Sequence, residues 1–149
     1  MTDIFNYYVE HSFATYTDTP VTPDQFVSLM AFYPGYPAVT ARVDLGVMAG
    51  FGLLRPYSMI PAFRNTAEMT CFLRPGFTGM GIGGAIVTEL ESGARELGIG
   101  SILATVSSLN EGSIGFHKAR GFVECGLLAE VGVKRGVPFD VVILLKKVS

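Results

Sequence analysis

The chain has 149 residues, of which 49% are hydrophobic and 16% charged, and its formal net charge is −2. This length predicts a single domain, residues 1–149, with one core that needs no disulfide or metal to stabilise it. Because the chain has neither a run of Lys and Arg nor an apolar run near the ~18 residues of a membrane span, it is not expected to bind nucleic acid or to enter a membrane.

The N-terminus indicates the compartment, and the cysteines bear on metal binding. The segment MTDIFNYYVEH lacks the basic flank and long apolar stretch of a secretory signal, which predicts a cytoplasmic protein. Cys71 and Cys125 form no C-x-x-C pair, and His11 and His117 do not complete a metal site with them. We therefore expect two buried thiols and no metal.

The first half of the chain predicts two helices and a meander of strands. Residues 2–13 have apolar side chains on one helical face, and Thr22, Pro23 and Gln25 form a capping box that begins a second helix. This helix is expected to end near Phe32. Residues 38–43 and 47–57 then flank a turn at Asp44-Leu45-Gly46, which is typical of a hairpin.

Residues 66–73, TAEMTCFL, alternate and predict a strand with Glu68 and Thr70 on the face opposite Met69 and Cys71. A glycine-rich stretch follows. Apolar residues at helical spacing then predict a helix that Gly98 terminates.

The last third of the chain predicts a strand, a helix and late strands. Residues 101–106, SILATV, form a short apolar strand, and residues 107–122 contain a short helix closed by Gly121. Strand-like segments follow near Val123 and at 139–145. With one β-α-β crossover in the middle, the pattern predicts a mixed α/β layer structure.

The glycine-rich stretch RPGFTGMGIGGA, residues 74–85, has five glycines and no acidic side chain. It is not a P-loop, because no Lys-Ser/Thr pair follows the glycines. Gly79, Gly81 and Gly84 match the dinucleotide pattern G-x-G-x-x-G, but the acidic residue expected about 20 positions later is missing. A connection without a ligand is one remaining interpretation. The other is a phosphate held by bare backbone N–H groups at the start of a helix.

Two sets of separated motifs, which occur in the right order along the chain, resemble a known family. FTGMGIGGAIVTEL after a strand and NEGSIGFHKARGF after the next strand resemble the acyl-CoA-binding core of the GNAT superfamily of N-acetyltransferases. FATYTDTPVT, IPAFRNTAE and VECGLLAEVGVKRGVPFDVV resemble the phosphinothricin-type amino-acid N-acetyltransferases, from about Ile4 to Leu145. The resemblance implies an α/β (α+β) GNAT fold with a mixed, mostly antiparallel central sheet flanked by helices. It also implies acetyl-CoA as the cofactor and a homodimer.

The resemblance implies that the glycine loop and the start of the later helix bind CoA. The N–H groups of Gly79, Gly81 and Gly83 would hold the pyrophosphate. The other implied cofactor-binding residues are Thr78, Met80, Ile82 and Gly84 in the loop, Phe72 and Leu73 as backbone oxyanion donors, and Asn110 and Ser113 beside the pantetheine. Asn110 also suits a helix N-cap, which alone explains its presence.

The loop departs from the family in charge. The family usually has Arg or Gln in place of Thr78 and often Arg in place of Met80. We therefore expect somewhat weaker and less salt-sensitive CoA binding.

Two residues are candidate catalytic groups. Glu68, in the family motif NTAE, is the candidate general base, and an ordinary solvent-facing strand carboxylate is the alternative. His117 stands where relatives carry the general acid, so it is expected to be an acid or relay for the CoA thiolate. The alternative is a half-buried histidine that packs against Phe116.

The loop RPYSMIPAFRN is expected to select the substrate. Arg64 is a candidate clamp for acidic groups, or else a surface arginine without a role. Tyr16, Tyr57 and Phe63 are expected to wall the pocket.

The predicted function is acetyl transfer from acetyl-CoA to the α-amine of a small amino acid or a toxic analogue such as phosphinothricin or methionine sulfoximine, by direct attack in a ternary complex. Alternatives are an acetyltransferase for a peptide or polyamine amine, and an acyl-CoA-binding sensor with little catalysis.

Relatives have an edge strand before the first helix, and this chain begins almost at that helix. We therefore expect a missing first edge strand, with either a dimer that covers the bare edge or lowered stability.

Overall fold

In the computed structural model, which describes residues 1–149, the chain begins with two helices, α1 (Thr2–His11) and α2 (Pro23–Met30). The predicted capping box opens α2: the Gln25 N–H donates to Thr22 Oγ1 (3.2 Å) and the Thr22 N–H donates to Gln25 Oε1 (2.9 Å). Both helices end about two residues before the predicted positions. In α2 the reason is Ala31, whose positive φ of 50° turns the chain out of the helix.

Six strands form one sheet. Their bounds are β1 (Ala38–Arg42), β2 (Met48–Pro56), β3 (Thr66–Leu73), β4 (Ser101–Ser107), β5 (Val123–Lys134) and β6 (Val137–Lys147). The order is β1-β2-β3-β4-β6-β5, and only β3 and β4 run parallel. The predicted mixed, mostly antiparallel sheet is confirmed, with β1 at one edge. Short 3-10 turns, η1 (Asp44–Gly46) and η2 (Pro61–Phe63), lie in the two connections that flank β2.

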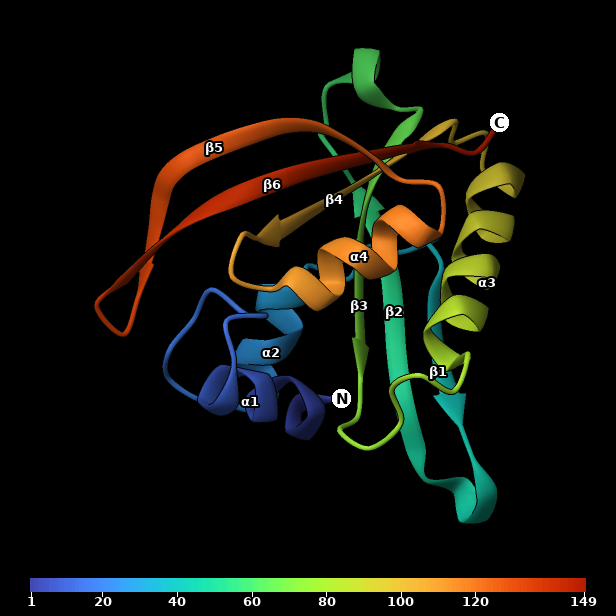
Figure 1. The fold of residues 1–149 in the computed structure, drawn as a ribbon. Helices are drawn as coiled ribbons and strands as arrows, with labels where there is room; N and C mark the ends of the chain where they lie inside the picture. The colour runs from blue at the N-terminus through green and yellow to red at the C-terminus, as the bar shows by residue number, and fades with distance from the viewer.

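The parallel pair β3–β4 separates soon after it forms. β3 pairs with β4 only over Thr66–Glu68, opposite Ser101–Leu103. β3 then continues beside β2 to Leu73, whereas β4 continues beside β6 to Ser107. Figure 1 shows β5 and β6 bending away from β2 and β3. Beyond Glu68 the middle of the sheet therefore has an opening.

Helices cover both faces of the sheet. α3 (Ile82–Glu96) packs against β1, β2 and β3 and forms the larger core through Ile86 and Leu90. It approaches β2 closely, since a Cβ on Gly52 would lie 2.5 Å from Ile86 Cγ2. α4 (Glu111–Ala119) joins the same core, and α1 and α2 cover the other face with a second core around Phe26. These layers place two helix ends, α3 and α4, beside the opening.

The last two strands are longer than predicted and form one hairpin, β5–β6. Lys134 near its turn is fully buried, and its ammonium donates to Ser12 O (2.7 Å), Thr15 O (3.1 Å) and Thr15 Oγ1 (3.0 Å). Burial lowers the pKa of Lys134, and the nearby Arg135 charge lowers it further. These bonds fix the loop between α1 and α2 against β5.

The prediction of two buried thiols is wrong for Cys125. Its position on the edge strand β5 leaves it exposed, whereas Cys71 on the central strand β3 is partly buried. Burial raises the pKa of Cys71 to about 12.

None of the helices combines the length and the apolar character that crossing a bilayer requires.

Candidate active site

A cavity of about 750 Å³ lies where β3 and β4 separate. Consecutive residues of β3, from Met69 to Leu73, line it, and their side chains alternate between the two faces of the sheet. The cavity therefore passes through the sheet. Its lining on the α1/α2 face includes Thr15, Tyr16, Arg55, Thr70 and Thr105, and on the α3/α4 face Gly79, Gly81, Ser113, Phe116 and Arg120.

The glycine loop presents free backbone N–H groups at the start of α3. Gly79 and Gly81 have φ of +73° and +80°, which favour glycine, and a Cβ at either position would contact nothing. Gly81 is the N-cap without a side-chain hydrogen bond, and the first bonded N–H is that of Ala85, which donates to Gly81 O (3.0 Å). The N–H groups of the first turn thus remain for an anion, so the loop fits a phosphate.

The other loop positions have different surroundings. Gly83 and Gly84 allow close packing of α4, because a Cβ would lie 2.8 Å from the Phe116 ring and 2.7 Å from Arg120 Nη2. Thr78 lines the cavity. Met80 is exposed and outside the lining, and Ile82 packs against the larger core.

Along the end of β3, every second backbone N–H points toward the opening, and the others point toward β2. The Phe72 carbonyl lies 2.9 Å from the Cβ that Gly50 would carry, and the Arg74 N–H donates to Ala49 O (2.7 Å), so both groups face β2. The Leu73 carbonyl instead accepts from the Tyr8 hydroxyl, away from β2. Since backbone groups alternate along a strand, the N–H of Leu73 faces the opening and that of Phe72 faces β2.

Glu68 lies opposite Arg55 of β2, and the two side chains form an ion pair. Arg55 Nε donates to Glu68 Oε2 (3.2 Å) and Nη1 donates to Thr70 Oγ1 (2.9 Å). Each side chain of the pair is about one quarter exposed, at 26% and 27%. Arg55 and Thr70 line the cavity. Glu68 is not part of the lining but is paired with Arg55, which is. The sequence analysis missed Arg55. Only the register of β2 against β3 places Arg55 opposite Glu68, and an irregular loop separates these two strands in the sequence.

His117 is buried at the cavity wall, with 7% of its surface exposed. Its Nδ1 lies 2.7 Å from Ser113 O, and because a carbonyl oxygen only accepts, Nδ1 carries the proton. Burial lowers the pKa of His117; the Ser113 hydrogen bond opposes this shift, and the Arg120 charge adds to it. The neutral ring therefore has a free lone pair on Nε2, which accepts a proton before it can donate one.

Asn110 and Ser113 both line the cavity. Asn110 Oδ1 accepts from the Ser113 N–H (3.3 Å) and caps α4, so the capping role is present. Gly112 also lines the cavity, and a Cβ there would contact nothing of the protein. Close packing within the chain thus does not account for this helical glycine.

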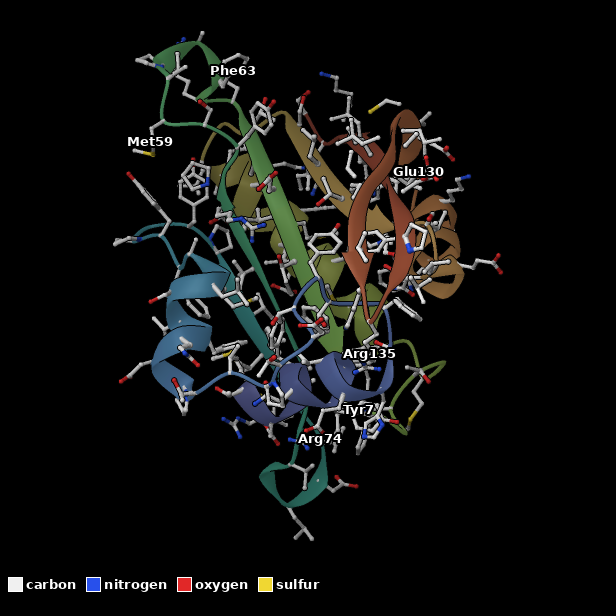
Figure 2. The ribbon with its side chains drawn as sticks, turned by 90° about the vertical axis from the view of Figure 1, so that its left-hand side faces the viewer. Tyr7, Met59, Phe63, Arg74, Glu130 and Arg135 are labelled. Atoms are coloured by element: carbon white, nitrogen blue, oxygen red, sulfur yellow. The ribbon has the colours of Figure 1, made fainter.

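The predicted substrate residues separate into two groups. Tyr16 lines the cavity and stacks on Phe139, with ring centroids 5.7 Å apart. Burial raises its pKa. Tyr57, Phe63 and Arg64 lie outside the cavity lining, and Arg64 Nη1 donates to Pro61 O (3.2 Å) in the exposed loop before β3. Figure 2 shows Met59 and Phe63 at the opposite end of the molecule from Tyr7 and Arg74. Roles for this second group stay predictions.

Comparisons with known proteins agree with this geometry. The model of the acetyltransferase (GNAT) family matches residues 1–122. Phosphinothricin N-acetyltransferase of Streptomyces viridochromogenes is 30% identical, over 93% of this chain and 76% of the relative. An L-methionine sulfoximine/L-methionine sulfone acetyltransferase of Salmonella typhimurium is also 30% identical, over 91% and 80%.

A solved structure has the same fold with its cofactor bound. The phosphinothricin acetyltransferase of Sinorhizobium meliloti in complex with acetyl-CoA superimposes with a TM-score of 0.86 at 29% identity, covering 98% of this chain and 80% of that one. The free N–H groups at the α3 N-terminus and the cavity through the sheet fit such a cofactor. The chain therefore belongs to the acetyltransferase (GNAT) family, with phosphinothricin-type relatives, and is an acetyl-CoA-dependent N-acetyltransferase.

Proposed function

We propose that the protein acetylates the α-amino group of a free amino acid or a close analogue, by direct attack while both substrates are bound. The observation that carries this proposal is the Arg55–Glu68 pair beside the cavity. An amino acid has a carboxylate and an ammonium group on one carbon, and a guanidinium beside a carboxylate complements both. Relatives named for phosphinothricin and methionine sulfoximine, which are amino-acid compounds, support this substrate class.

Arg55 and Glu68 would divide the recognition of the acceptor. Arg55 uses Nε for Glu68 and Nη1 for Thr70, which leaves the Nη2 donors for the carboxylate of the acceptor. Glu68, which is paired with Arg55, would then take a proton from the ammonium group, as a general base does. Tyr16, held by its stacking on Phe139, would wall the acceptor site on the same face.

Bound acetyl-CoA supplies the acetyl group as a thioester, whose C–S bond breaks as the N–C bond forms and whose sulfur leaves as a thiol. The Leu73 N–H, facing the opening, would polarise the thioester carbonyl. The acceptor nitrogen loses two protons: Glu68 accepts the first, and His117 Nε2 accepts the second and passes it to the sulfur. Asn110 and Ser113 would position the pantetheine.

Replacing Glu68 by Gln should lower kcat by about 100-fold or more, because general-base catalysis is worth factors of this size. CoA binding should stay unchanged. Thiol release from acetyl-CoA, measured with phosphinothricin, methionine sulfoximine, methionine sulfone and the common amino acids, tests this and identifies the acceptor. Glu124→Gln is the matched control, since Glu124 pairs with Lys118 outside the cavity. Full activity of Glu68→Gln would show that Glu68 is not the general base. CoA binding without turnover on any amino acid would favour the sensor or a peptide or polyamine acceptor.

Replacing Arg55 by Gln should raise the KM for the amino acid about tenfold or more and leave the KM for acetyl-CoA nearly unchanged, because a charge-assisted bond to the carboxylate is lost. The amide of the same amino acid, which has no carboxylate, should show little change. Arg64→Gln removes the same charge from the exposed loop and serves as the control. If Arg64→Gln alone raised the KM, the loop, and not Arg55, would hold the acceptor.

The lowered pKa of His117 should appear in the pH dependence of stability. Between the ordinary value near 6.5 and the lowered value, the unfolded chain binds more protons than the folded chain, so the free energy of unfolding falls as the pH falls. His117→Asn should flatten this slope. Urea unfolding of both proteins from about pH 7 to about pH 5 measures it, and equal slopes would contradict a lowered pKa.

We further propose that the predicted homodimer forms at the β5 edge of the sheet. This edge strand exposes Val123, Leu127, Leu128, Val131 and Val133 by 46% to 67%. Exposed apolar edges promote association, and a second copy of the chain is the occupant that covers such a strand without a separate partner. The bare edge expected beside the first helices, β1, is short and ends in Arg42, so it is the weaker candidate.

The double variant Leu127→Glu, Val131→Glu should be monomeric where the natural chain is dimeric, because two charges would be buried in the contact. Sedimentation equilibrium measures the mass. Leu45→Glu, at the fully exposed tip of the β1–β2 connection, is the control and should stay dimeric. A natural chain that is monomeric throughout the concentration range would refute this proposal.

A further inference from the structure

The start of α3 lacks basic side chains of its own, yet a cation lies beside it. Thr78 and Met80, in the loop before α3, carry no charge. Arg120, at the C-terminal end of α4, is distant in the sequence but lines the same cavity as Gly79, Gly81 and Gly83. A Cβ on Gly84 would lie 2.7 Å from Arg120 Nη2, so the guanidinium rests directly against the first turn of α3.

The side chain of Arg120 is held in place without a counter-ion. Its Nη1 donates to Phe116 O (3.2 Å), and its guanidinium carbon lies 3.9 Å from the centroid of the Phe116 ring. No carboxylate forms an ion pair with it, whereas Arg55, Arg74 and Arg95 each have one. Nε and Nη2 thus keep their donors for another group. The charge also reaches into the cavity. Burial raises the pKa of Cys71 and the Arg120 charge opposes this shift, whereas for His117 the charge adds to the lowering of the pKa that burial causes.

We infer that Arg120 binds the pyrophosphate of CoA and supplies the positive charge that Thr78 and Met80 do not. Free N–H groups of the α3 first turn and an unpaired guanidinium converge on one place, and together they complement a phosphate. The absence of a Cβ at Gly84 is what allows the guanidinium to approach the helix. CoA binding then remains sensitive to salt, in contrast to the expectation drawn from the loop sequence alone.

The inference rests on acetyl-CoA binding, not on the acceptor chemistry of Glu68 and Arg55, so its test uses binding without acceptor. Isothermal titration calorimetry with CoA should show about tenfold weaker binding for Arg120→Gln and a shallower dependence on salt. Arg120→Lys, which keeps the charge, should recover part of the affinity. Lys118→Gln removes the same charge from the same helix, but Lys118 pairs with Glu124 (2.8 Å) outside the cavity, and it should bind CoA as the natural chain does.

Two further ligands identify the phosphate group. Dephospho-CoA, which lacks the 3′-phosphate, should lose the same factor as CoA in Arg120→Gln, and pantetheine, which has no phosphate, should lose nothing. Equal CoA affinity in Arg120→Gln and the natural chain would overturn the inference. A loss confined to CoA would place Arg120 at the 3′-phosphate instead, and a loss shared by pantetheine would indicate a structural effect; either result overturns the pyrophosphate contact. Failure of the amino-acid panel with intact CoA binding would leave this inference standing.

Discussion

β3 and β4 pair over only three residues each, and the rest of the site depends on this early separation. A parallel pair that continued would saturate the backbone of β3 and close the sheet. Instead β4 follows β6, β3 follows β2, and the N–H of Leu73 remains unpaired by β4. The opening connects the two faces of the sheet, so a cofactor on the α3/α4 side and an acceptor on the α1/α2 side can meet within it.

Glycines set how closely the helices approach this opening. Gly52 brings α3 against β2, while Gly83 and Gly84 admit Phe116 and Arg120 of α4. The positive φ at Gly79 and Gly81 directs the loop so that the first turn of α3 stays uncapped. The same residue type therefore serves packing in some positions and backbone exposure in others, and only the contacts of each position separate the two uses.

Two arginines give the cavity its polarity. Arg55 lies beside Glu68 on one face, and Arg120 lies beside the α3 N-terminus on the other. Under the proposed chemistry, each arginine binds the anionic part of one substrate, the carboxylate of the acceptor and the pyrophosphate of CoA. His117 lines the same cavity, and its Nδ1–H donates to Ser113 O, so that the lone pair of Nε2 is free to accept a proton. A loop with low charge is thus compatible with a cavity that attracts anions.

The sequence by itself determined the elements and the family. Alternation along 66–73 predicted β3 with both of its bounds correct, and the capping box placed the start of α2. Two glycine-containing motifs identified the CoA-binding core. These features could be predicted because their signals are local. Helix ends and the length of the β5–β6 hairpin were less well predicted, since Ala31 and long-range pairing decide them. Only the tertiary structure selected Arg55 and Arg120 and left Arg64 outside the cavity, because strand register and helix packing bring together side chains that no local pattern connects.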